Sequence, residues 1–265
     1  MSKKIHTIYS SDKIEFENRV NYFLELGCEL LEGSYEIIKN EEGVVYSQVV
    51  VFENCEVKFW FNFELQNYEQ IKSICYLNKD GDKNGLHKMW YENGQKKRVG
   101  SYKDGKQDGF WTTWYENGQK TEEGTFKDGK QDEFWTTWYE NGQKQKRGTY
   151  KDGEKDGLWT YWYKDNGQKK NEGTFKDGEI DGLWTSWYED GQMEREGKFK
   201  DNKQYGLWTH WDENGMWREG TYKDGEKDGL FTWWYENGQK SCEFTYKDGK
   251  EISFKSCYED GSVGN

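Results

Sequence analysis

The chain has 265 residues and a formal net charge of −12, and only 32% of its residues are hydrophobic. Aromatic residues supply more than half of that hydrophobic set, and proline is absent. This composition excludes an ordinary aliphatic core and favours many short strands with tight turns, because aromatic residues suit pleated surfaces and glycine supplies positive φ. The acidic balance argues against direct nucleic-acid binding and favours a partner protein with a basic surface.

Cysteine usage and hydropathy indicate the compartment. The 5 cysteines contain no C-x-x-C pair, so neither a disulfide framework nor a zinc site is indicated. No apolar run approaches the roughly 18 residues of a membrane span. We therefore expect a cytoplasmic protein without a signal peptide or transmembrane segment, and with no metal and no cofactor.

Residues 1–54 predict a small α+β domain in the order strand, helix, strand, strand. Asp12 and Glu15 form a capping box before apolar residues at helical spacing, and CELLEGSYEIIK and VVYSQVVVF predict a hairpin. The words LGCELLEGSY and YSQVVV resemble a small bacterial domain family of unknown function, which implies a fold and no activity. Residues 55–77 predict an irregular joining hairpin.

From residue 78 to residue 265 the sequence repeats in about eight units of 24 residues, each opened by an Asp-Gly pair. A unit this short holds two strands. Asn117-Gly118 predicts a two-residue type I′ hairpin turn, and KDGKQDG predicts a looser return turn. The expected fold is mainly β. It is an elongated single-layer antiparallel ribbon of β-hairpin repeats with a small N-terminal α+β cap, and its last unit is a degenerate cap.

Counting outward from the turns places a large ring opposite a glycine in five units. The pairs are Trp111 with Gly124, Trp135 with Gly148, Trp159 with Gly173, Trp184 with Gly197, and His87 with Gly100. A glycine in a strand leaves its backbone bare, and a ring lying across it from the opposite strand restores buried area. The rings are therefore predicted to form the core of a sheet that has no second layer.

The unit DGLWTYWYKDNGQKKNEGTFKDGEIDG resembles the variant class of MORN repeats, in which G-x-W-x-x-Y-Y-x-N-G is followed by G-x-Y-x-D-G. The resemblance covers residues 78–261. It implies a MORN-like hairpin ribbon, and bacterial proteins of this kind are widely labelled antitoxin-like. A bacterial or phage origin is the corresponding expectation.

No motif predicts catalysis or a metal site. NKDGDKNG at 78–85 alternates oxygen ligands, but Lys83 and Met89 stand where a calcium loop needs glycine and a bidentate glutamate. The three histidines lie in unrelated contexts, and neither a nucleophile arrangement nor a phosphate-binding glycine loop occurs. We expect a protein that is not an enzyme.

The positions that differ between units indicate where a partner would bind. In the frame W-T-x-W, the residue x differs from unit to unit and predicts an exposed row: Thr113, Thr137, Tyr161, Ser186, His210 and Trp233. Tyr161, His210 and Trp233 are candidate partner-binding residues. Met216 and Trp217 join them, because ENGMWREG has lost one residue and places an aromatic side chain near a turn.

These features favour a non-enzymatic binding protein that neutralises another protein, as an antitoxin, an immunity protein or a phage-encoded inhibitor of a nuclease such as a CRISPR effector does. Acidity fits this role, because an acidic surface can occupy a basic nucleic-acid channel. One alternative is a scaffold that self-associates into dimers or filaments. Another is lipid or carbohydrate binding through exposed aromatic residues.

Overall fold

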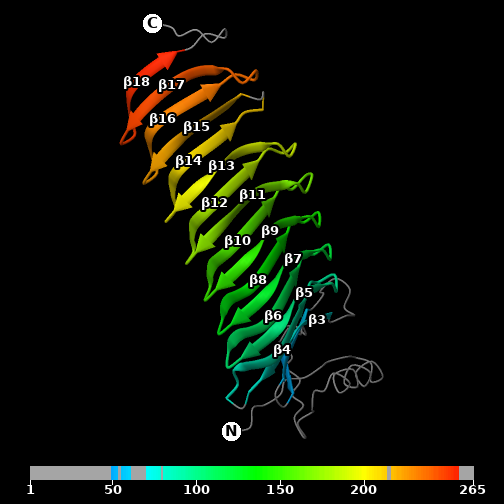
Figure 1. Ribbon diagram of the computed structural model, residues 1–265. Helices are drawn as coiled ribbons and strands as arrows, with labels where there is room; N and C mark the ends of the chain where they lie inside the picture. The colour runs from blue at the N-terminus through cyan, green and yellow to red at the C-terminus, as the bar shows by residue number, and fades with distance from the viewer. Residues whose placement is uncertain (1–48, 53–54, 61–69, 79, 214–215, 257–265) are drawn as a thin grey trace, which may run out of the picture. The chain divides into compact units, whose positions relative to one another are not determined.

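The computed structural model describes residues 49–52, 55–60, 70–78, 80–213 and 216–256. The helix and the first strands predicted for the N-terminal domain lie outside the described residues. The chain divides between Lys130 and Gln131 into two units, and in each unit consecutive strands pair antiparallel (Figure 1). Among the described residues, no helix is long and apolar enough to cross a membrane.

Unit 1 is a meander of short strands. They are β1 (Val49–Phe52), β2 (Cys55–Trp60), β3 (Gln70–Leu77), β4 (Lys83–Trp90), β5 (Lys96–Lys103), β6 (Lys106–Trp114) and β7 (Lys120–Lys127). β2 pairs with β3 as the predicted joining hairpin. β1 pairs with β2, with Val50 opposite Val57, so the sheet continues across the predicted domain boundary at residue 54.

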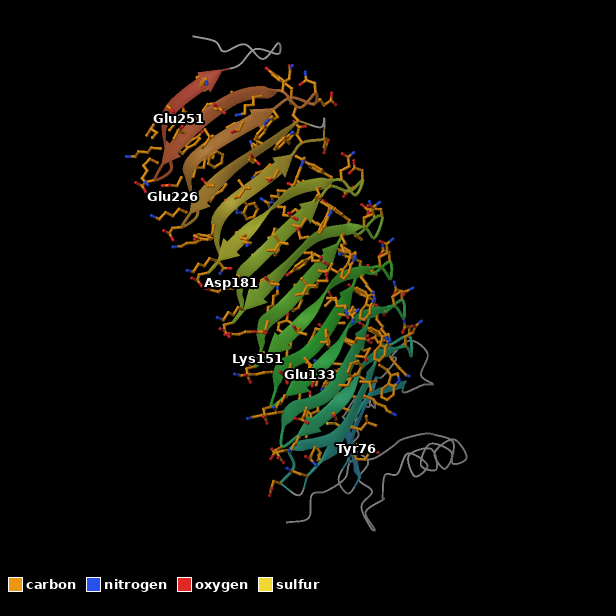
Figure 2. All side chains as sticks on the ribbon, viewed as in Figure 1. Tyr76, Glu133, Lys151, Asp181, Glu226 and Glu251 are labelled. Carbon is orange, nitrogen blue, oxygen red and sulfur yellow. The ribbon has the colours of Figure 1, made fainter. Side chains whose placement is uncertain are left out.

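Unit 2 continues the same hairpin pattern. Its strands are β8 (Lys130–Trp138), β9 (Lys144–Lys151), β10 (Glu154–Trp162), β11 (Lys169–Lys176), β12 (Glu179–Trp187), β13 (Met193–Lys200), β14 (Lys203–Trp211), β15 (Trp217–Lys223), β16 (Glu226–Trp234), β17 (Lys240–Lys247) and β18 (Lys250–Ser256). Side chains stand on both faces of this one layer (Figure 2). The predicted fold class, a single-layer ribbon of β-hairpin repeats, is confirmed.

The two kinds of turn are the reverse of the prediction. Asp104 and Gly105 have φ of 47° and 80°, and Lys103 pairs with Lys106, so the Asp-Gly turn is the tight type I′ turn. The equivalent residue pairs of the later repeats have the same signs of φ, including Asp201-Asn202, where asparagine replaces the glycine. In Figure 2, Lys151 and Glu226 flank two of these turns along one edge of unit 2.

The Asn-Gly turn is a three-residue loop. Within Glu116-Asn117-Gly118 only Gly118 has a positive φ, of 85°. Gly118 N–H donates to Tyr115 O at 3.0 Å, and Tyr115 N–H donates to Gln119 O at 2.7 Å. This is a type I turn followed by a left-handed glycine. The Asn117 side chain supports it by accepting a hydrogen bond from Gln119 N–H at 2.9 Å.

The predicted register is nevertheless confirmed, because a β-bulge compensates for the longer loop. Trp114 pairs with Lys120 but Thr113 pairs with Glu122, so Thr121 is an extra residue in β7. Without the bulge, the longer loop would shift every later pair by one residue. All five predicted pairs are therefore present: Trp111 with Gly124, Trp135 with Gly148, Trp159 with Gly173, Trp184 with Gly197, and His87 with Gly100.

The prediction of which ring covers which glycine is wrong. A Cβ atom at Gly148 would lie 2.2 Å from Cδ2 of Trp159, and one at Gly197 would lie 2.1 Å from Cδ2 of Trp208. Likewise, Trp111 lies over Gly100 instead of Gly124, and Gly173 is covered by Trp184 instead of Trp159. Trp111, Trp159, Trp184 and Trp208 thus each cover a glycine of the preceding strand, on the side away from their own hairpin partner. His87 instead stands opposite Cys75 of β3, a strand without glycine.

A second bulge explains this direction. Val99 pairs with Thr112 and Ser101 pairs with Asp108, so the three residues 109–111 stand opposite Gly100 alone. The interrupted ladder leaves Ser101 O to accept a hydrogen bond from Trp111 Nε1 at 3.0 Å. Equivalent bonds join Trp159 to Thr149 O and Trp208 to Lys198 O, each at 3.0 Å.

The rings that lie over the glycines are buried, although the sheet is one layer thick. Trp111, Trp159 and Trp208 are 1%, 1% and 0% exposed. Tyrosine and phenylalanine rings from the intervening strands pack edge-to-face between them, as Phe199 does against Trp208 with centroids 5.0 Å apart. We call the face of unit 2 that carries Trp159, Trp184, Trp208 and Phe231 the Trp face. As predicted, rings on this face form the core; Trp159, Trp208 and Phe231 are buried, and Trp184 is half-buried.

Candidate functional site

The row of differing x residues lies on the Trp face and is not exposed, contrary to the prediction. Ser186 is 0% exposed, and the other x residues are half-buried. The reason is strand alternation, which puts x on the same face as the buried ring two residues before it. The Tyr161 ring lies 6.2 Å from Trp159, and the Trp233 ring lies 6.3 Å from Phe231, between centroids.

The exposed row is instead the residue directly before each buried ring. In unit 2 these side chains are 49–64% exposed, and they are Phe134, Leu158, Leu183, Leu207 and Leu230. We call the face that they occupy the Leu/Phe face. This row was not predicted from the sequence, although one large apolar residue directly before each tryptophan or phenylalanine ring was a signal for it.

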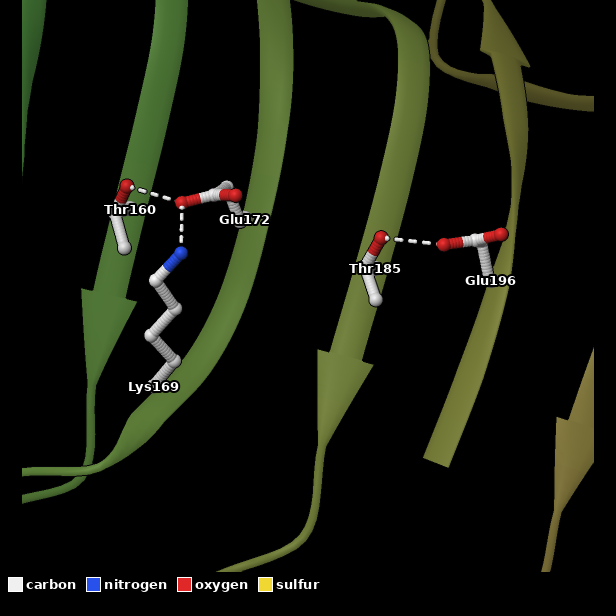
Figure 3. Close-up of polar contacts among 5 residues, drawn as sticks. All are labelled: Thr160, Lys169, Glu172, Thr185 and Glu196. Atoms are coloured by element: carbon white, nitrogen blue, oxygen red, sulfur yellow. Dashed lines mark hydrogen bonds and ion pairs between the residues drawn. The ribbon is translucent and has the colours of Figure 1, made fainter. Parts of the chain in front are cut away.

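An acidic row runs beside the exposed apolar row on the same face. Glu172 accepts hydrogen bonds from Thr160 Oγ at 2.9 Å and from Lys169 Nζ at 2.7 Å (Figure 3). Burial raises the pKa of Glu172, but these two bonds outweigh burial and leave the pKa below its ordinary value. Glu172 therefore stays ionised at neutral pH. The members of the row in unit 2 are Glu172, Glu196, Glu219 and Glu243, with Arg147 as the exception.

Four of the five predicted partner-binding residues meet at one pocket in unit 2. The pocket has a volume of 260 Å³, and His210, Met216, Trp217 and Trp233 contribute to its lining. The remaining walls include the aromatic residues Tyr188, Trp211 and Trp234 and the charged residues Glu194, Asp212 and Arg218. Sequence reasoning identified the centre of this group from the lost residue in ENGMWREG.

The strands β14, β15 and β16 build the pocket from two rows of cross-strand partners. Trp217 pairs with Trp211 on one side and with Trp234 on the other. The rings of Trp217 and Trp234 stack with centroids 3.7 Å apart and planes 5° apart. In the second row, Arg218 pairs with both His210 and Trp233.

His210 is a neutral imidazole at pH 7. Burial, and then the positive charges of Arg218, Arg195 and Lys227, lower its pKa to about 4. Its Nε2 atom is buried without a hydrogen-bond partner. In the part of the chain that the structure describes, no group of three or more His, Cys, Asp or Glu side chains could hold a metal ion. The pocket thus offers rings, two carboxylates, a guanidinium and a neutral imidazole, which is chemistry for binding.

Tyr161, the fifth predicted residue, does not line this pocket. Its hydroxyl accepts a hydrogen bond from Lys155 Nζ at 2.7 Å, and burial raises its pKa to about 12. The same ammonium lies 4.8 Å from the Trp159 ring centroid and 4.7 Å from that of Phe175. Tyr161 is therefore occupied by contacts within the sheet.

Comparison with known families identifies the hairpins. Six segments match the family model described as MORN repeat variant: residues 83–104, 107–128, 135–152, 180–201, 204–224 and 227–248. These six segments are MORN repeat variants. Between the third and fourth matches, β10 and β11 form one more such hairpin, whose loop is one residue longer, since Tyr163 N–H donates to Gln168 O.

Other comparisons add little to this MORN-variant protein. No curated protein matches the chain. Among solved structures, the Photorhabdus luminescens Tc holotoxin pore with the mutation TccC3-D651A is similar at 10% identity and a TM-score of 0.20. That match covers 86% of this chain and 15% of the other, so the chain spans a small part of its length. The fold therefore rests on the strands and turns described above.

Proposed function

We propose that this MORN-variant protein is a non-enzymatic binding protein whose Leu/Phe face docks a partner protein. The observation that carries the proposal is the row of large apolar side chains from Phe134 to Leu230, each 49–64% exposed. Contiguous exposed apolar surface marks interaction sites in soluble proteins. The row is periodic, one side chain for every two strands, which corresponds to a spacing of roughly 10 Å.

Charge supports a basic partner. The net charge is −12, and the glutamate row that includes Glu172 and Glu196 lies beside the apolar row. A periodic acidic and apolar face suits a protein surface that is itself basic, such as the nucleic-acid channel of a toxin or nuclease. By covering that surface, the chain would neutralise its partner, as an antitoxin, an immunity protein or a nuclease inhibitor does.

The test is a triple variant that puts charge on the exposed row without touching the core. Leu158→Asp, Leu183→Asp and Leu207→Asp together should abolish capture of the partner from the native host while leaving the melting temperature almost unchanged. Lys151→Asp, at the edge of the same unit, is the control and should retain capture. Nucleic acid should compete with the chain for the captured partner. Unchanged capture by the triple variant, or no competition, would contradict this proposal.

Self-association through the same face is the second candidate. Leu158 stands opposite Thr174, and Leu207 stands opposite Thr221, so large and small side chains alternate across the strands. A second copy could place its leucines over the threonines. Light scattering over a hundredfold range of concentration separates the candidates, because a concentration-independent monomer excludes self-association.

A further inference from the structure

The hairpin β14–β15 departs from its neighbours at two positions, and both changes remove a side chain from the same place. The loops of the other hairpins in unit 2 open with a tyrosine, whereas this loop opens with Asp212. β15 also lacks the bulge residue of the other hairpins, since His210 pairs with Arg218 and Trp211 pairs with Trp217 without a shift.

The neighbouring hairpins show what these side chains do. The Tyr163 hydroxyl donates to Trp187 O at 2.8 Å, and the Tyr188 hydroxyl donates to Trp211 O at 2.9 Å. The tyrosine thus spans from its own loop to the end of the next hairpin's first strand. The bulge residue covers the ring, as Lys170 does with its Nζ 5.2 Å from the Tyr163 ring centroid.

The 260 Å³ pocket lies where β14–β15 has neither side chain. Tyr188, from the preceding hairpin, forms one wall, and Trp234 and Ser241, from the following hairpin, form another. Glu194 and Ser241, which also line it, are the bulge residues of the two flanking hairpins. Asp212 stands at the position of the tyrosine. The pocket therefore lies where the row of spanning tyrosines, which includes Tyr163 and Tyr188 in the preceding hairpins, is interrupted.

The walls define the chemistry of an occupant. Tyr188, Trp211 and Trp217 provide aromatic surface, and Asp212 and Glu194 provide carboxylates. Arg218, the basic residue of the lining, is held beside His210 and Trp233 by its strand register. A flat group that stacks on rings and donates several hydrogen bonds matches these walls. A guanidinium does both, whereas an ammonium is a compact charge and a phenol has one donor.

We propose that this pocket binds the side chain of an arginine on the partner protein. The inference rests on the proposed function, because it supplies one specific contact to a partner with a basic surface. The Leu/Phe face would give the area of the interface, and the pocket would select the partner by one anchor residue.

The direct test uses N-acetyl-L-arginine amide as a probe, titrated into the full chain and followed by tryptophan fluorescence and ligand-observed NMR. We expect saturable binding in the millimolar range, at least roughly tenfold tighter than that of N-acetyl-L-tyrosine amide or N-acetyl-L-lysine amide. Tighter binding of either comparison probe, or no saturable binding of the arginine probe, overturns the proposal.

Three variants assign the binding to the pocket. Asp212→Tyr restores the tyrosine of the other loops, and it should fill the pocket, raise the melting temperature and abolish probe binding. Asp212→Asn keeps the oxygen that accepts the hydrogen bond from Met216 N–H at 3.0 Å but removes the charge. This variant should lower the affinity for the arginine probe roughly tenfold. Asp165→Asn, in the loop of β10–β11, is the matched control and should bind normally.

Partner capture separates this inference from the proposed function. If Asp212→Tyr captures the partner as well as the unchanged chain does, the arginine anchor is wrong and docking on the Leu/Phe face stands. If Asp212→Tyr loses the partner while the triple aspartate variant keeps it, the pocket binds the partner and the Leu/Phe face does not.

Discussion

The two faces of unit 2 both carry apolar side chains, yet neighbouring residues on opposite faces differ sharply in burial. Leu207 and Trp208 are neighbours in β14, and Leu207 is 55% exposed whereas Trp208 is 0% exposed. Leu158 and Trp159, in β10, differ in the same way, at 55% and 1%. No second layer of the described residues covers either face, so hydrophobicity alone does not decide which side chain is buried.

The backbone determines which of the two side chains is buried. On the Trp face, a bulge directs the rings to the preceding strand, where a glycine such as Gly197 leaves room for the Trp208 ring. Main-chain oxygens accept the indole hydrogen bonds of Trp159 and Trp208. On the Leu/Phe face the partners across the strands are threonine or lysine, as Thr221 is for Leu207. In a one-layer sheet, glycine and bulge positions create the core, and the opposite face stays available for binding.

The largest expected effect tests the two neighbours directly. Trp208→Ala removes a fully buried ring and should lower the free energy of unfolding by about 4 kcal/mol. Leu207→Ala removes a half-exposed side chain and should cost less than about 1 kcal/mol. Urea denaturation followed by circular dichroism measures both. Equal losses of unfolding free energy in the two variants would show that the two faces do not differ in their contribution to stability.

The next effect tests the glycine. A Cβ at Gly197 would meet the Trp208 ring at 2.1 Å, so Gly197→Ala should displace the ring and cost about 3 kcal/mol. Gly206, with a φ of 70°, has no atom within 4 Å of the corresponding position. Gly206→Ala should therefore cost only the backbone strain, about 1 kcal/mol. The reverse order in thermal denaturation would show that the rings are not seated on glycine.

A third prediction concerns pH at the border of the Trp face. The pKa of His210 in the folded chain is about 4, below the unfolded value of 6.5, so the unfolded chain binds the proton first as pH falls. Stability should therefore fall between pH 6.5 and 4, by roughly 1–2 kcal/mol after allowance for partial exposure. His210→Thr introduces the residue found at this position in the first repeats. The variant should lose this fall in stability between pH 6.5 and 4, as measured by thermal denaturation at several pH values. An unchanged pH dependence in the variant would mean that His210 is not desolvated.

The smallest prediction concerns the ring-directing bulge. Glu133 has a φ of 57° at a position where other units have glycine, such as Gly157 with a φ of 82°. Glu133→Gly should relieve the left-handed strain and raise the free energy of unfolding by about 1 kcal/mol. Gly157→Glu is the reciprocal variant and should lower it by a similar amount. A destabilised Glu133→Gly variant would contradict the role given to this bulge.

Most of the fold could be predicted from sequence, because alternation and glycine spacing specify strand faces and register. The turn types could not, since Asn-Gly and Asp-Gly both tolerate positive φ, and the choice depends on a bulge at Thr121 several residues away. The exposed row was missed for another reason. Tyr161 and Trp233 differ between units and suggested an exposed surface, but strand alternation places them on the face of the buried rings two residues before them.

The unequal turns have a consequence for how such a protein can change over evolutionary time. The type I′ Asp-Gly turns contain two residues and leave no spare residue. An insertion there would shift the register by one residue and move every side chain of the following strand to the opposite face. The loops at the opposite edge, together with their bulges, tolerate changes in length. The loop after Tyr163 is one residue longer than the others, and the hairpin at Asp212 is one residue shorter, yet the side chains of the strands keep their faces. New specificities can therefore arise along one margin of the sheet without refolding the rest.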